Sequence, residues 1–154
     1  MLSQTVEYAL RAMSSLAYRP NDLVPTSELA ETTKVPSNYL AKVLQTLAGA
    51  DLIMGRRGVG GGYRLSRAPE EISLLEVVNA VNPVERITTC PLGLDNHGPN
   101  LCPLHRRMDE AARLVMELFG STTLADIVSG EGTPQLPLCS ESMTQQIRIE
   151  RAGK

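Results

Sequence analysis

The feature that most constrains this chain is a glycine-rich segment that follows two short amphipathic segments and lies between two short strand-like runs. The segment reads Gly58-Val59-Gly60-Gly61-Gly62 and separates residues 52–57 from residues 63–67. This arrangement predicts a β-hairpin, because glycine readily adopts the backbone angles of tight turns. The flanking runs are short and carry basic residues, so the hairpin is expected to face outward rather than into a core.

Amphipathic patterns before the hairpin predict three helices. The first spans residues 3–18, where apolar residues recur at intervals of three and four. A short helix over 27–33 follows, with Thr26 as its expected N-cap. After a tight turn, Ser37 is expected to cap a longer helix over about 38–50. Two helices joined by a tight turn form a helix-turn-helix, and the hairpin would be its wing.

The segments after the hairpin differ in pattern. Ser73 and Glu76 have the spacing of a capping box, which would open a helix to about Val81 and close a winged domain at residues 1–81. Residues 82–102 lack periodicity and are expected to form a cysteine-containing sensor loop.

A second expected unit, residues 103–129, comprises a long dimerisation helix and a short following helix. Its apolar residues alternate at spacings of three and four, as in a two-stranded coiled coil, so we expect a homodimer. The expected interface residues, which follow Leu101 at this spacing, are Leu104, Met108, Ala111, Val115 and Leu118. The polar tail, residues 130–154, is expected to be disordered. The predicted fold class is therefore mainly α with a small β-hairpin: a winged helix-turn-helix domain plus a long dimerisation helix.

Composition excludes several classes of protein. The 154 residues suit one domain with an appended element. No apolar run approaches the roughly 20 residues that span a bilayer, and no signal peptide is evident, so we expect a cytoplasmic protein without membrane contact. We find no nucleophile motif, paired carboxylates or cofactor fingerprint, and therefore expect no enzyme.

Charge is distributed in favour of nucleic acid, although the net charge is −2. Between residues 34 and 67, lysines and arginines face a single acid, Asp51. A polar face on the helix at 38–50 could contact base edges in a major groove, and the basic wing could contact phosphates or a narrow minor groove. The expected contacts with double-stranded DNA are Ser37, Asn38, Tyr39, Lys42, Arg56, Arg57 and Gly60. Each feature alone would suit a solvated surface, but their order along the chain favours DNA binding.

The cysteines suggest a second site. Pro103 suits the first position of a helix, which would make Cys102 the N-cap and place His105 one turn on. Both side chains could then point at one ion or cluster, with Cys90 and His97 reaching it from the loop. The alternative is two buried cysteines and a surface histidine. Cys139, in the tail, is assigned no role.

These residues resemble the Rrf-type regulators, the group containing the iron–sulfur cluster regulator, the nitric-oxide-sensing repressor and the cysteine-metabolism repressor. The resemblance covers roughly residues 1–128. It is carried by Tyr8-Ala9-Leu10-Arg11-Ala12-Met13, by Ser37-Asn38-Tyr39-Leu40, and above all by Arg57-Gly58-Val59-Gly60-Gly61-Gly62-Tyr63. It implies a dimer formed through the long helix, a recognition helix at 38–50, a wing that reaches the minor groove, and a palindromic operator.

The resemblance also implies a cluster, with one departure from the usual pattern. Many members bind a cluster through three loop cysteines spaced C-x₅-C-x₅-C. Here Cys90 and Cys102 match the outer positions and His105 matches a histidine found after the last cysteine in some members, but Asn96 stands at the middle position.

Other members use two loop cysteines and a carboxylate from the first helix of the partner subunit, at the position of Glu7. Without that resemblance, Glu7 would be expected only to pair with Arg11 on the same helix. The implied cofactor is thus a [2Fe–2S] cluster on Cys90, Cys102, His105 and Glu7, with His97 as the alternative nitrogen ligand.

The resulting hypothesis is a repressor that senses redox state, iron–sulfur status or nitric oxide. The alternative is a cluster-free regulator of the same fold that responds by cysteine oxidation or to a small molecule or partner protein. An electron carrier or a non-specific DNA-packaging protein is disfavoured, because neither explains a recognition helix and wing together with the cysteine loop.

Overall fold

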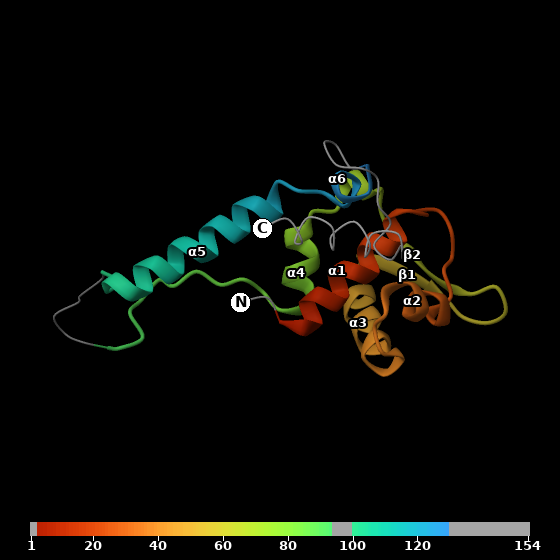
Figure 1. Cartoon of the computed structure of the whole chain (residues 1–154), viewed down its shortest axis with the longest axis horizontal. Helices are drawn as coiled ribbons and strands as arrows, with labels where there is room; N and C mark the ends of the chain where they lie inside the picture. The colour runs from red at the N-terminus through yellow and green to blue at the C-terminus, as the bar shows by residue number, and fades with distance from the viewer. Residues whose placement is uncertain (1–2, 94–99, 130–154) are drawn as a thin grey trace, which may run out of the picture.

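In the computed structural model, residues 3–93 and 100–129 are described, and they form one helical body from which a long helix projects (Figure 1). The elements in chain order are α1 (Gln4–Ala17), α2 (Thr26–Thr33), α3 (Ser37–Gly49), β1 (Ile53–Arg56), β2 (Gly62–Leu65), the 3₁₀ turn η1 (Pro69–Glu71), α4 (Leu74–Val81), α5 (Pro103–Gly120) and α6 (Leu124–Ser129).

Helix α1 lies at the centre of the body and packs against α2, α3, α4 and α6. Ser3 caps it, with Oγ accepting a hydrogen bond from the Val6 N–H at 3.3 Å. Met13 and Leu16 on its inner face are fully buried, as are Leu40 and Leu44 of α3. The predicted first helix is confirmed, because its three-and-four spacing matches the face that the core covers.

The predictions that Thr26 and Ser37 are N-caps are wrong. Each is the first residue inside its helix, and Pro25 and Pro36 occupy the N-cap positions without a side-chain capping hydrogen bond. Proline fixes φ near −65°, and the observed φ values of −59° and −57° let the helix begin directly afterwards. Helix α2 ends at Thr33, and the φ of 56° at the next residue, Lys34, turns the chain toward α3.

The hairpin is confirmed, and it faces outward except at its base. Strand β1 pairs antiparallel with β2, and Ile53 opposite Leu65 is buried at the base of the hairpin. At the other end, Gly62 lies against the backbone of Val24, where an added Cβ would stand 2.3 Å from the Val24 carbonyl oxygen. Tyr63 and Val24 exchange two backbone hydrogen bonds of 2.9 Å. The wing is therefore anchored to the chain segment before α2.

The capping box at α4 is confirmed. Ser73 Oγ accepts from the Glu76 N–H at 3.2 Å, and the Glu76 carboxylate accepts from the Ser73 N–H at 2.9 Å. Partial burial raises the pKa of Glu76, but hydrogen bonds from Ser73 and Arg67 lower it, and the net shift is downward. Helix α4 packs against α1 and α3 and closes the body.

Helix α5 differs from the other helices, because none of its residues is buried. It extends away from the body, and residues 82–93, hereafter the linker, run beside it (Figure 1). At its carboxyl end Phe119 packs against the core, and α6 returns there with Leu124 fully buried. No helix within residues 3–93 and 100–129 has the length and apolar character to cross a membrane. The predicted tail at 130–154 lies outside the described residues.

Candidate functional site

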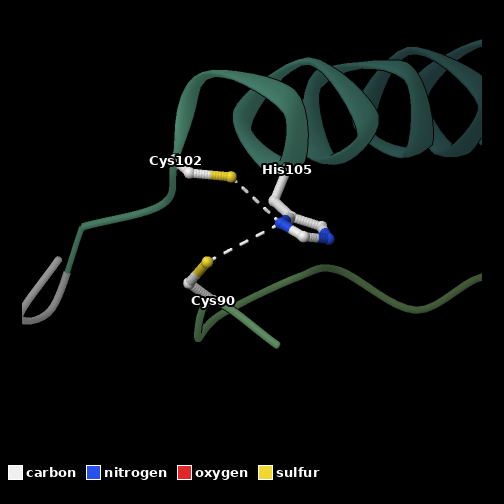
Figure 2. A group of neighbouring side chains, drawn as sticks. All are labelled: Cys90, Cys102 and His105. Atoms are coloured by element: carbon white, nitrogen blue, oxygen red, sulfur yellow. Dashed lines mark hydrogen bonds between the residues drawn. The ribbon is translucent and has the colours of Figure 1, made fainter. Parts of the chain in front are cut away.

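Three predicted ligands converge at the outer end of α5. The side chains of Cys102 and His105, on the first turn of the helix, and of Cys90, on the linker, point toward one another (Figure 2). His105 Nδ1 lies 3.1 Å from Cys102 Sγ and 3.6 Å from Cys90 Sγ. The three candidate ligand atoms all lie within 4.8 Å of one another, and all three residues are half-buried.

The start of α5 explains why Cys102 and His105 meet. Cys102 is the N-cap, with φ −63° and ψ 163°, and Pro103 takes the first helical position, as the sequence predicts. Residues three apart on a helix share a face, so the imidazole of His105 returns to the thiol of Cys102. The backbone N–H groups at a helix N-terminus favour negative charge, which suits a thiolate.

Two thiols and an imidazole form a donor set that suits metals. Cysteine sulfur and histidine nitrogen are the ligands of iron–sulfur clusters and of zinc sites. The group offers three ligands from one chain, and a four-ligand site needs one more. The residues present therefore fit a metal centre that a further donor completes.

Glu7, the predicted fourth ligand, does not join this group within one chain. Its carboxylate is half-exposed and pairs with Arg11 Nε at 2.5 Å, and Arg11 also donates to the Thr33 carbonyl at 3.1 Å. The predicted local ion pair is thus present. His97, the alternative ligand, lies outside the described residues.

Two residues that sequence reasoning missed connect the linker to α5. Arg86 forms a two-point ion pair with Asp109, 2.5 Å from Nε to Oδ1 and 2.6 Å from Nη2 to Oδ2. Ile87 N–H donates to the same carboxylate at 3.0 Å. The hydrogen bonds from Arg86 lower the pKa of Asp109, and the same contact raises the pKa of Arg86. No local spacing signals this pair, because the partners are 23 residues apart.

The predicted DNA contacts lie on α3 and the wing. Ser37, Asn38, Tyr39 and Lys42 are exposed on α3, with Tyr39 53% exposed although its ring contacts Tyr8 of α1 at 6.3 Å between centroids. On the wing Arg56, Arg57 and Gly60 are exposed. Gly60 has φ +71°, a conformation that favours glycine at the tip.

The basic side chains of this surface are available for an external partner. Lys42, Arg56 and Arg57 form no ion pair with any other described residue. The cations that do form ion pairs are arginines at other positions, so Lys42, Arg56 and Arg57 keep charges that no ion pair within the described residues offsets.

A stripe of large exposed apolar side chains runs along α5. Its most exposed members are Leu104 at 64%, Leu118 at 62%, Leu114 at 53% and Met108 at 50%. Sequence reasoning missed Leu114, which lies outside the three-and-four spacing. On the same face of the helix, Ala111 and Val115 line a hollow of about 420 Å³ together with Met108 and apolar residues of α1, α4 and the linker.

Comparison with known proteins identifies the family. The model of the Rrf2 family, described as iron-dependent transcriptional regulators, matches residues 2–130. The chain belongs to the Rrf2 family. This confirms the resemblance found in the sequence, and it agrees with the expectation that the chain is not an enzyme.

Several Rrf2 relatives match most of this chain. The HTH-type transcriptional regulator NsrR of Bacillus subtilis is 31% identical over 137 residues, 84% of this chain and 91% of NsrR. IscR of Sodalis glossinidius is 29% identical over 131 residues, 84% of this chain and 79% of IscR.

Solved structures confirm the fold class. The structure of CymR, the global cysteine regulator of B. subtilis, matches with a TM-score of 0.71 at 24% identity, covering 84% of this chain and 96% of CymR. T. potens IscR also gives 0.71, at 21% identity over 94% of this chain and 96% of that structure. Family membership makes the protein a DNA-binding transcription regulator, and the solved structures show its winged-helix fold.

Proposed function

We propose that this Rrf2 regulator is a repressor that senses redox state, iron–sulfur status or nitric oxide through a [2Fe–2S] cluster. Cys90, Cys102 and His105 supply three ligands, and the partner's Glu7 supplies the fourth. In this proposal residues 82–102 are the sensor loop, residues 1–81 read DNA, and the protein acts in the cytoplasm, where its operator lies.

The convergence of Cys90, Cys102 and His105 carries the proposal. Residues 15 positions apart, on the linker and on α5, bring sulfur and nitrogen within 3.6 Å. The family description as iron-dependent supports iron as the metal. A cluster with non-thiolate ligands on one iron has a raised reduction potential, which suits redox sensing.

The shape of α5 supports a homodimer that binds a palindromic operator. A helix with no buried residue and a stripe of exposed leucines would remain largely in water in a single chain. A second copy of α5 can cover the stripe formed by Leu104, Met108 and Leu118, and can approach the hollow at Ala111 and Val115. A two-fold dimer would present two copies of α3 to successive major grooves.

The DNA contacts we propose are those predicted from the sequence on α3 and the wing. Lys42, Arg56 and Arg57 would contact phosphates or the minor groove, because they are exposed cations without an ion-pair partner among the described residues. Ser37, Asn38 and Tyr39 would contact DNA from the N-terminal end of α3, and Gly60 would let the wing backbone approach it.

Anaerobic reconstitution with iron and sulfide tests the cluster. Wild-type protein should take up two iron and two sulfide per site, with visible absorption of the sulfide-to-iron type. Cys102→Ala and His105→Ala should lose most of it, and Glu7→Ala should retain well under half. Cys139→Ser is the matched control. It removes the chain's third cysteine, which is not part of the proposed site, and should take up the full amount of iron and sulfide.

Three results would contradict parts of this assignment. Wild-type protein that takes up neither iron nor sulfide would remove the cluster. Tight uptake of zinc alone, with no sulfide, would replace it by a mononuclear site. Loss of the cluster in His97→Ala but not in His105→Ala or Glu7→Ala would move the nitrogen ligand to His97 and remove Glu7 from the site.

The cluster-free alternative has one observation in its favour, the closeness of the two thiols. Because Cys90 Sγ and Cys102 Sγ lie within 4.8 Å, hydrogen peroxide could oxidise the two thiols to a disulfide, and their two electrons and two protons would reduce the peroxide to two molecules of water. Peroxide-dependent loss of operator binding in metal-free protein, abolished by Cys90→Ser, would favour this alternative.

A further inference from the structure

Besides the contact between Cys90 and His105, one carboxylate of α5 connects the linker to this helix. Asp109 accepts two hydrogen bonds from the Arg86 guanidinium and a third from the Ile87 backbone N–H. Only 16% of the Asp109 side chain is exposed, whereas 43% of Arg86 is exposed. Paired N–H···O bonds between a guanidinium and a carboxylate fix the relative orientation of both groups, which a single contact cannot do.

The location of this pair relates it to the cysteine site. Asp109 follows His105 by four residues, one helical turn, and Arg86 precedes Cys90 by four residues. The three Cα-to-Cα steps from Ile87 to Cys90 can span at most about 11 Å, so fixing Ile87 confines Cys90 to the neighbourhood of His105. Cys102 and His105 are held by the helix itself, so Cys90 is the ligand whose position depends on the linker.

We propose that Arg86 and Asp109 are positioning residues that hold Cys90 against Cys102 and His105. The proposal deepens, and rests on, the function proposed above for this site, and its test uses metal-free protein so that the two can fail separately. Without the ion pair, the linker would sample a wider volume, and the three ligand atoms would converge in a smaller fraction of molecules.

Ionisation keeps the pair intact near neutral pH. Hydrogen bonding and the charge of Arg86 lower the pKa of Asp109, and Asp109 raises the pKa of Arg86. A carboxylate with a lowered pKa in the folded state contributes stability above its unfolded pKa, and this is lost as pH falls through the folded value. The attachment should therefore be complete at the pH of the tests below.

Thiol bridging in metal-free protein tests the proposal directly. Reduced, chelator-treated protein carrying Cys139→Ser is reacted with dibromobimane, which becomes strongly fluorescent when it bridges two nearby thiols. Asp109→Asn and Arg86→Gln should slow bridging of Cys90 to Cys102 by at least about threefold, because the effective concentration of one thiol near the other falls. Arg86→Lys, which keeps the charge but not the planar fork, should give an intermediate rate.

Two controls separate positioning from general damage. Glu110→Gln breaks the 2.6 Å pair with Arg107, which joins residues within α5 and does not involve the linker, and it should leave the bridging rate unchanged. Monobromobimane, which modifies single thiols, should react with all variants at similar rates, and their thermal unfolding should match that of the parent.

The outcomes distinguish this proposal from the proposed function. Bridging rates in Asp109→Asn and Arg86→Gln equal to the parent, or an equal decrease in Glu110→Gln, would overturn the positioning role even if wild-type protein binds a cluster. If bridging depends on the pair but wild-type protein takes up no iron or sulfide, the positioning role is upheld and the cluster is rejected.

Discussion

The winged body and the arm formed by α5 and the linker use similar amphipathic helices in opposite ways. In α1 and α3 the apolar faces are fully buried in one core, which Leu44 and Met13 exemplify. In α5 no residue is buried, and half or more of each of its large outer apolar side chains is exposed. The body thus buries its apolar side chains within one chain, whereas the arm leaves many of its own exposed. We infer that the winged body, to which we assign DNA binding, is complete within one chain, and that the arm, to which we assign sensing, is completed by a second copy.

The largest expected difference between the two regions is in stability. Leu44→Ala should lower the free energy of unfolding by about 2–5 kcal/mol, because it leaves a cavity in the core. Leu104→Ala should change the unfolding midpoint only through dimerisation, so its effect should vary with protein concentration. Chemical denaturation over a range of concentrations measures both. A concentration-independent loss of similar size in Leu104→Ala would contradict the distinction.

The next largest effect is expected on dimerisation, when a carboxylate is placed on the exposed stripe of α5. Leu118→Glu should weaken dimerisation by about thirtyfold or more, corresponding to roughly 2 kcal/mol for burying a charge in an apolar contact. Arg113→Glu, on another face of α5, is the matched control and should keep the dimer. Sedimentation velocity gives the dissociation constants. Equal dimerisation of Leu118→Glu and wild-type protein would remove this stripe from the interface.

A smaller effect, on the affinity for DNA, is expected from a substitution on the wing. Arg57→Ala should weaken operator binding by about fivefold to tenfold and reduce the salt dependence by about one unit of slope, because one phosphate contact is lost. Arg107→Ala removes an exposed cation from the arm instead and should bind as wild-type protein does. Fluorescence anisotropy at several salt concentrations distinguishes them. Arg57→Ala with unchanged affinity at every salt concentration would exclude the wing contact.

Local sequence patterns predicted the features that depend on neighbouring residues. The periodicity of α1, the hairpin around Gly60, the capping box at Ser73 and the N-cap at Cys102 are all set within a few positions of the chain. Serine and threonine are the usual N-cap residues, so the sequence favours Thr26 and Ser37 as the caps of α2 and α3. In the structure the preceding prolines occupy the cap positions instead.

Features that depend on distant residues were not predictable in this way. The pairing of Arg86 with Asp109 depends on how the linker lies along α5, which no spacing rule describes. The buried base of the hairpin at Ile53 depends on the core that surrounds it. The role of Glu7 remains a prediction, since in one chain it pairs with Arg11.

Mixed dimers test most directly whether the sensor is completed by a second chain. A Glu7→Ala chain and a Cys102→Ala chain, carrying different tags, are co-expressed, and the heterodimer is purified through both tags and reconstituted anaerobically. If the ligands come from two chains, the loop of the Glu7→Ala chain meets an intact Glu7 across the interface, and one of the two sites is restored. The account predicts about half the wild-type iron and sulfide, clearly above both parental homodimers. Iron and sulfide no higher than the mean of the two parents would contradict it.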